Sequence, residues 1–135
     1  MARIRKLPPS RYPVYLRRAR QYERQLSRAL EEKEWETASV CAIHLGISAV
    51  DALTCALLGQ VWSGEDHAGA ADLLRTVPAT GNDPAIRHLL ALLESNSRVE
   101  YGAEAASAAT TVGLGQHARR LFEWVVQALR ATGRT

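Results

Sequence analysis

The chain has 135 residues, 47% of them hydrophobic, a length and composition that suit one folded domain and exclude a disordered chain. Its formal net charge is +3, from 17 Lys and Arg against 14 Asp and Glu. The excess is concentrated early, since the first 24 residues hold eight basic side chains against Glu23 alone. Basic residues gathered in this way either form a solvated helix face or contact phosphate.

Membrane and disulfide chemistry are not expected. His44 and Asp51 interrupt the longest apolar run, which therefore falls short of the roughly 20 residues that a membrane span needs. The basic N-terminus lacks the apolar stretch that follows in a secretory signal. Cys41 and Cys55 lie on one predicted helix, about 21 Å apart along its axis, which is too far for a disulfide. We expect reduced thiols, no membrane contact and a cytoplasmic protein.

The N-terminal half begins with a basic lead-in, residues 1–11, in which Pro8 and Pro9 favour extended backbone. A first helix is predicted from Tyr12 to about Lys33, with Pro13 in its first turn. Its apolar stripe is Tyr15, Ala19, Tyr22, Leu26 and Leu30. On the opposite side, steps of three and four residues align the candidate phosphate contacts Arg17, Arg20, Arg24 and Arg28.

Four more helices follow in the predicted order. The second runs from about Trp35 to Leu58, is apolar nearly all round and ends at Gly59. The third starts in the capping-box-like segment Ser63-Gly64-Glu65-Asp66, and the fourth follows Asp83 and Pro84. A turn near Tyr101-Gly102 leads to the last helix, roughly Ala106 to Ala131. This pattern predicts an all-α fold, a single-domain antiparallel bundle of about five helices over residues 12–131.

The second helix carries an organised polar stripe at spacings of three, four, three and four: Cys41, His44, Ser48, Asp51 and Cys55. Three interpretations are open. The stripe could hydrogen-bond to neighbouring helices, supply Cys41 and His44 to a metal site with a ligand from elsewhere, or form a ligand or catalytic site around His44 and Asp51. We favour the first and expect no metal or cofactor. His67, at the start of the third helix, is expected to contact the stripe.

Three segments, AIHLGISAVDALTCALLG, GEDHAGAADLLRTV and ALLESNSRVEYG, resemble HEPN domains, a superfamily of small helical bundles. The corresponding positions are His44 and Asp51, then His67 ahead of Leu73-Leu74, then Arg98 with Tyr101. The resemblance extends roughly from Tyr12 to Leu129 and is strongest to an uncharacterised bacterial branch. It implies a HEPN-like bundle with a candidate polar site comprising His44, Ser48, Asp51, His67, Arg98 and Tyr101.

Catalytic HEPN proteins are metal-independent ribonucleases that use an Arg followed, four to six residues later, by a His. Arg98 is the natural candidate here, but Ala103, Glu104 and Ala105 occupy the positions where the histidine should lie. An alanine cannot transfer a proton, so the resemblance favours a non-catalytic binding or assembly module. It also implies a homodimer, with a nucleotidyltransferase-type antitoxin as a protein partner.

The alternative is an RNA- or nucleotide-binding protein, or a HEPN ribonuclease in which His67 or His44 is a displaced base. Structural roles compete here as well, because Arg98 can pair with Glu94 one helical turn away and Tyr101 can bury its ring. The three tryptophans, Trp35, Trp62 and Trp124, are expected to anchor the packing or, where exposed, an interface.

Overall fold

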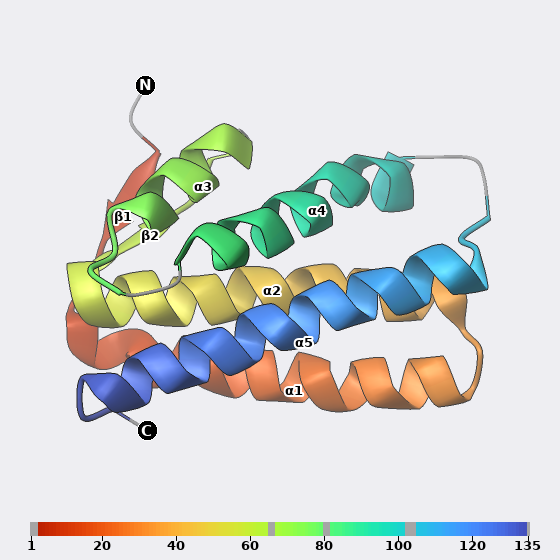
Figure 1. Ribbon diagram of the computed structural model, residues 1–135, viewed down its shortest axis with the longest axis horizontal. Coiled ribbons are helices and arrows are strands. Elements are labelled where there is room, and N and C mark those ends of the chain that lie inside the picture. Colours follow the sequence, from red (N-terminus) through yellow and green to blue (C-terminus); the bar gives the residue numbers. More distant parts are fainter. Residues whose placement is uncertain (1–2, 65–66, 80–81, 102–104, 135) are drawn as a thin grey trace.

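The computed structural model describes residues 3–64, 67–79, 82–101 and 105–134, without the side chains of residues 67, 82 and 97–101. The described part holds five α-helices: α1 (Tyr12–Glu31), α2 (Trp35–Leu58), α3 (His67–Arg75), α4 (Asn82–Tyr101) and α5 (Ala108–Ala131). Figure 1 shows α1 and α5 on one side of α2 and the pair α3 and α4 on the other. The predicted all-α class is confirmed.

Helix α2 is the centre of the bundle. Most of its side chains are buried, including the fully enclosed Leu45, Leu53 and Cys55, because helices pack around much of its circumference. It ends where Gly59 takes the left-handed conformation, with φ of 65°, and donates its N–H to the Cys55 carbonyl. Only glycine adopts this conformation without strain, so the chain can turn sharply there.

By length and composition α2 also passes the test for a membrane span, with a mean hydropathy of 1.8 over an 18-residue window. His44 and Asp51 therefore do not shorten the apolar run as far as expected. However, 72% of that window is buried inside the protein, as in the core helix of a bundle. The expectation of no membrane contact stays a prediction.

A small antiparallel sheet was not expected. Strand β1 (Ile4–Lys6) pairs with β2 (Gln60–Trp62), with Arg5 opposite Val61. A 3-10 helix, η1 (Pro9–Arg11), then packs on the end of α2, where the Cys55 thiol faces the Pro8 carbonyl at 3.6 Å. Residues 3–11 are therefore part of the fold rather than a separate lead-in, because the turn after Gly59 offers them an unpaired strand edge.

The predicted boundaries of α3 and α5 need correction. Ser63 does not start a helix, since its backbone N–H and its hydroxyl both donate to the Arg3 carbonyl, at 2.9 and 2.8 Å. Residues 65–66 of that expected capping segment lie outside the described residues. Helix α5 begins after Ser107, whose hydroxyl accepts from the Thr110 N–H at 3.1 Å. A side-chain oxygen at this position satisfies one of the free N–H groups of the first turn.

A buried pair of hydroxyls joins α2 to α5. Ser39 Oγ and Thr111 Oγ1 lie 3.0 Å apart, and both side chains are buried. Because each hydroxyl can donate and accept, one hydrogen bond between them removes most of the cost of burying two polar groups. Gly115 of α5 lies against α1 instead, close to Leu26 and Leu30.

Candidate functional site

The polar stripe lies along the side of α2 that faces α1 and η1. The His44 imidazole stacks on the Tyr22 ring of α1, with centroids 5.3 Å apart and planes 23° from parallel. Ser48 is buried, Asp51 is partly buried, and Cys55 contacts the Pro8 carbonyl. Neighbouring elements therefore cover the stripe, and none of its members extends into bulk water far from them.

The predicted hydrogen-bonded seam is seen only at one end of the stripe among the described residues, where the Cys55 thiol donates to the Pro8 carbonyl. The side chains of His44, Ser48 and Asp51 make no hydrogen bond to a neighbouring helix within the described part of the chain. At His44 the facing side chain is Tyr22 of α1, whose ring stacks on the imidazole. Ring stacking and longer-range electrostatics act in place of the expected bonds.

The metal interpretation also gains no support from the described residues. Cys41 and Cys55 are free and buried, and burial raises the pKa of both thiols. In the described part of the chain, no group of three His, Cys, Asp or Glu side chains lies close enough to hold an ion. Zinc sites require three or four such ligands.

Asp51 differs from the other members of the stripe, because it also lines a cavity of about 90 Å³. This Asp51 cavity lies between α2, β2, α3 and α4, and its wall is mainly aliphatic, with Ile47, Val50, Leu73, Leu89 and Leu93. Burial raises the pKa of Asp51 to about 7, and only the Arg18 guanidinium opposes this shift. Arg18 itself lies over the Tyr15 ring, 5.4 Å from its centroid, and forms no ion pair with Asp51.

Trp62 supplies a buried, unsatisfied polar group at this cavity. It comes from β2 and lines the cavity wall, and its indole packs against Gly69 so closely that a side chain there would collide with the ring. Its Nε1–H is buried and has no hydrogen-bond partner among the described residues. Buried polar groups without partners are rare, so this N–H beside the Asp51 carboxyl group marks the strongest candidate site in the described part of the molecule.

For the other three candidate site residues, the structure describes only the backbone. His67 is the first residue of α3, and Arg98 and Tyr101 lie in the last part of α4, but their side chains are outside the described residues. The predicted contact of His67 with the stripe therefore stays a prediction. Leu93 is the last α4 residue at the Asp51 cavity, so the Arg98 backbone lies about 7 Å farther along the helix axis.

A histidine pair was missed at the sequence level. His88 of α4 and His117 of α5 place their Nδ1 atoms 2.9 Å apart, with one imidazole donating to the other. Burial lowers the pKa of His88, and the positive charges of His117, Arg120 and Arg87 lower it further. The two residues are 29 apart in the chain, so no local motif could have indicated the pair.

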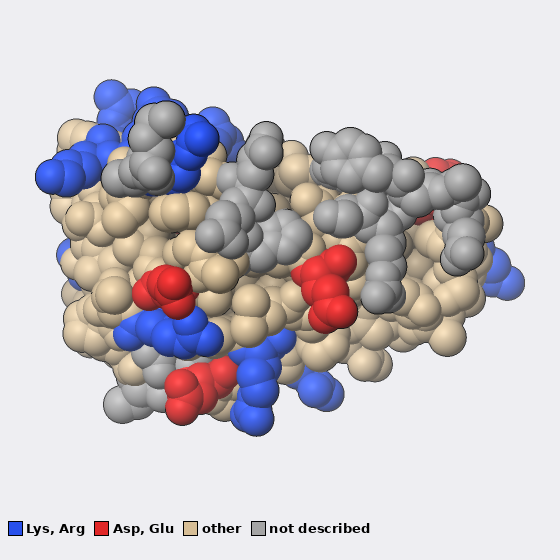
Figure 2. Space-filling view, turned by 90° about the horizontal axis from the view of Figure 1, so that it is seen from above, with Lys and Arg blue, Asp and Glu red and all other residues tan. Residues whose placement is uncertain are grey.

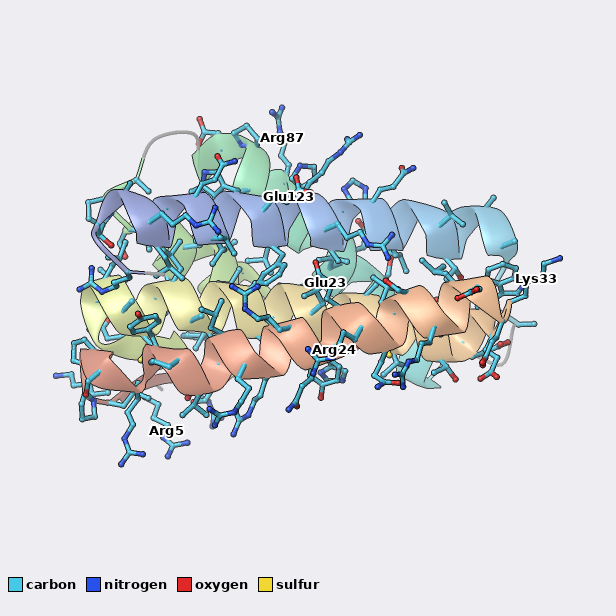
Figure 3. All side chains as sticks on the ribbon, turned by 90° about the horizontal axis from the view of Figure 1, so that it is seen from below. Arg5, Glu23, Arg24, Lys33, Arg87 and Glu123 are labelled. Atoms are coloured by element: carbon cyan, nitrogen blue, oxygen red, sulfur yellow. The ribbon has the colours of Figure 1, made fainter. Side chains whose placement is uncertain are left out.

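The arginine face of α1, defined as Arg17, Arg20, Arg24 and Arg28, is exposed as predicted. Figure 3 shows Arg24 projecting from α1 away from the rest of the bundle. Arg24 and Arg28 line an open hollow between α1 and α5 together with Glu23, Ser27 and Arg119. Arg119 reaches across from α5 to donate to Ser27 Oγ at 2.8 Å, and Arg20 lies 5.6 Å from the centre of the Phe122 ring.

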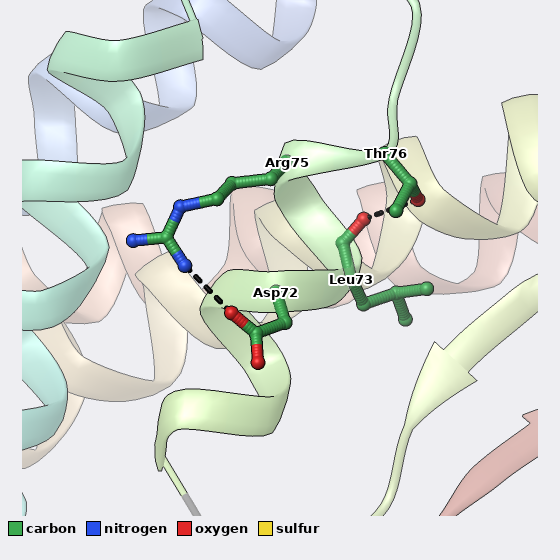
Figure 4. Close-up of polar contacts among 4 residues, drawn as sticks. All are labelled: Asp72, Leu73, Arg75 and Thr76. Atoms are coloured by element: carbon green, nitrogen blue, oxygen red, sulfur yellow. Dashed lines mark hydrogen bonds and ion pairs between the residues drawn. The ribbon is translucent and has the colours of Figure 1, made fainter.

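These four arginines have no ion-pair partner among the described residues, in contrast to Arg75 on α3. Figure 4 shows Arg75 pairing with Asp72 one helical turn away, at 2.7 Å. The guanidinium groups of these four α1 arginines are therefore available to an external anion. A second basic region lies at the β1 end of the molecule, where Lys and Arg side chains gather in Figure 2.

No protein-family model, curated protein or solved structure matches this chain.

Proposed function

We propose that this protein is a non-catalytic helical binding module that holds the phosphate backbone of RNA on the arginine face of α1. The observation that carries the proposal is the row of four exposed guanidinium groups without ion-pair partners among the described residues. From Arg17 to Arg28 the row covers about 16 Å of helix, long enough to meet several consecutive phosphates. The resemblance to HEPN domains makes RNA the first polyanion to test.

The distribution of the candidate groups supports the proposed absence of catalysis. Arg98 has no histidine at the spacing that the ribonuclease chemistry needs, since Ala103, Glu104 and Ala105 stand there. His44, the described candidate for a displaced base, stacks on the inner side of α1 against Tyr22, whereas the arginine face is on the outer side. A base cannot act on a phosphate held on the opposite face of a helix, because proton transfer requires hydrogen-bond distance.

The expected homodimer belongs to the same proposal, because two copies would present two arginine faces to one strand. Pairing with a nucleotidyltransferase-type protein is the corresponding proposal for a protein partner. Exposed apolar side chains on α4 and α5, Leu90 and Val112, are available for such contacts.

The test compares two charge-matched double variants for binding to a single-stranded RNA across a series of salt concentrations. Arg24→Gln with Arg28→Gln should weaken binding and reduce the slope of log affinity against log salt by about 2, one for each phosphate that is no longer neutralised. Arg75→Gln with Arg87→Gln removes the same charge from α3 and α4 and should leave both quantities nearly unchanged. Sedimentation of the complexes gives the number of chains per strand, and intact RNA after incubation is expected.

Equal decreases in affinity for the two double variants would show that only net charge matters and would overturn the arginine face as the binding surface. Salt-independent binding would overturn the phosphate contact itself. Cleavage of the RNA by the unmodified chain would contradict the non-catalytic part of the proposal.

A further inference from the structure

Among the described residues, the Asp51 cavity has one charged group in a mainly aliphatic wall. Asp51 is partly buried, and its carboxyl group makes no hydrogen bond or ion pair with any described residue. A carboxylate in such surroundings is costly, because partial burial removes some of its hydration and no described residue replaces it. Proteins that keep such a group usually use it at a functional site.

The neighbouring charges leave this carboxyl group open to an external partner. Arg18, from α1, is the one basic group among the described residues whose charge acts appreciably on Asp51, and it lies over the Tyr15 ring instead of forming an ion pair. A metal ion does not fit, because no three His, Cys, Asp or Glu side chains of the described chain lie close enough together to hold one. An anion does not fit either, because the ionised carboxylate would repel it.

The cavity itself sets the size and polarity of the ligand. Its volume of about 90 Å³ is smaller than the roughly 150 Å³ that holds benzene and equals the share of about three liquid water molecules. The aliphatic wall, with Leu73, Leu89 and Leu93, favours an apolar body over a fully hydrated one. Thr54 and Trp62 add a hydroxyl group and an aromatic surface to the wall.

We propose that the Asp51 cavity binds the protonated head of a small aliphatic amine, with the ammonium group paired to the Asp51 carboxylate and the alkyl chain against the aliphatic wall. The ammonium supplies the hydrogen bonds and the opposite charge that the carboxylate lacks. The Trp62 indole contributes an aromatic surface to which cations are attracted. The site is independent of the arginine face, which lies on the other side of α2.

The test uses n-propylammonium chloride as the probe, and n-propanol as a neutral compound of the same size. Binding to the full chain is followed through the indole N–H signal of Trp62, assigned by comparison with Trp62→Phe. We expect a saturable shift with millimolar propylammonium and at least about tenfold weaker binding of propanol. Ammonium chloride at the same ionic strength should leave the Trp62 indole signal unshifted, because the ammonium ion has no apolar body.

Two variants and one control decide whether Asp51 is the anchor. Asp51→Asn removes the charge with little change of shape and should weaken propylammonium binding at least about tenfold. Asp72→Asn removes a charge from the exposed face of α3 and should bind as the unmodified chain does. Ala70→Leu fills the cavity from α3 and should abolish binding even if the Asp51 variant behaves unexpectedly.

Three results would overturn the proposal. Equal affinity for propanol and propylammonium would reduce the site to an apolar hollow. Unchanged propylammonium binding in Asp51→Asn would show that the ammonium group binds elsewhere. The lack of any saturable shift would mean that the cavity holds only water.

Discussion

The two sides of α2 are built in different ways. On the side of α1, side chains fill the space, and the polar group His44 is covered by the Tyr22 ring. On the side of α3 and α4, a cavity persists, and a carboxyl group and an indole N–H are left without hydrogen-bond partners among the described residues. Close packing is the normal condition of a protein interior, so the second side departs from it at some cost in stability. The difference indicates that α1 stabilises the bundle, whereas the α3 and α4 side holds the candidate ligand site.

The largest expected effect tests the difference in packing. Leu26→Ala removes a fully buried side chain of α1 that packs beside Gly115, and should lower the free energy of unfolding by about 3–5 kcal/mol. Leu73→Ala enlarges a cavity that already exists, so the decrease should be nearer to about 2 kcal/mol. Urea denaturation measures both values. Equal decreases would mean that the two sides are equally well packed.

The next effect concerns the charge that the cavity side buries. The pKa of Asp51 is raised to about 7, from 3.8, so the unfolded chain ionises at a lower pH than the folded one. Asp51 therefore lowers stability increasingly as the pH rises from about 4 to 7, and its cost is constant above that range. Asp51→Asn should raise the free energy of unfolding by about 1–3 kcal/mol at pH 8, and by much less at pH 4.5.

Asp72→Asn is the control for this variant, since the Asp72 carboxyl group is exposed and paired with Arg75. This control should change the free energy of unfolding by less than about 1 kcal/mol at either pH. Both variants are measured by urea denaturation at the two pH values. If Asp51→Asn raised the free energy of unfolding by the same amount at both pH values, the carboxyl group would be hydrated in the folded protein.

The smallest expected effect concerns the contact between α4 and α5. Here the free energy of unfolding falls as the pH drops, whereas Asp51 lowers it as the pH rises. Burial, and then the positive charges of His117, Arg120 and Arg87, lower the pKa of His88 below its ordinary value of 6.5. The unfolded chain therefore takes up a proton that the folded chain resists, and stability falls as the pH drops below about 6.5. In the Asp51→Asn background, where the carboxyl contribution is absent, this decrease should be visible between pH 7.5 and 5.

Nuclear magnetic resonance titration measures the pKa of His88 directly. His117→Gln removes one positive neighbour, so it should move that pKa back toward 6.5 and reduce the decrease of stability in acid. A His88 that titrates at or above 6.5 in the unmodified chain would contradict the close pairing of the two rings.

Much of the helical framework was predictable because helix signals are local. The predicted second helix, Trp35 to Leu58, coincides with α2, and the first and last helices differ from α1 and α5 by about one turn or less. The apolar stripe around Leu26 and the exposed arginine face both follow from the 3.6-residue period. By contrast, β1 and β2 are three residues each and too short to show alternation, so their pairing left no periodic signal.

The candidate site was only half predictable. The spacing on one helix identified Asp51 as unusual, but the same spacing suggested hydrogen bonds across the stripe that the described residues do not make. Whether a polar side chain is satisfied depends on what the facing helix presents, and Tyr22 of α1 presents its ring to His44. The cavity depends on four elements at once, including Trp62 from the unexpected strand β2.

The sequence by itself determined the helices, their order, the central position of α2 and the outward direction of the α1 arginines, because each depends on residues within a few turns of one another. Only the tertiary structure decided that β1 closes the end of the bundle, that His88 meets His117 across 29 residues, and that Asp51 faces a cavity rather than a partner. These features depend on contacts between distant segments, and a local pattern carries no information about the distance between such segments in space.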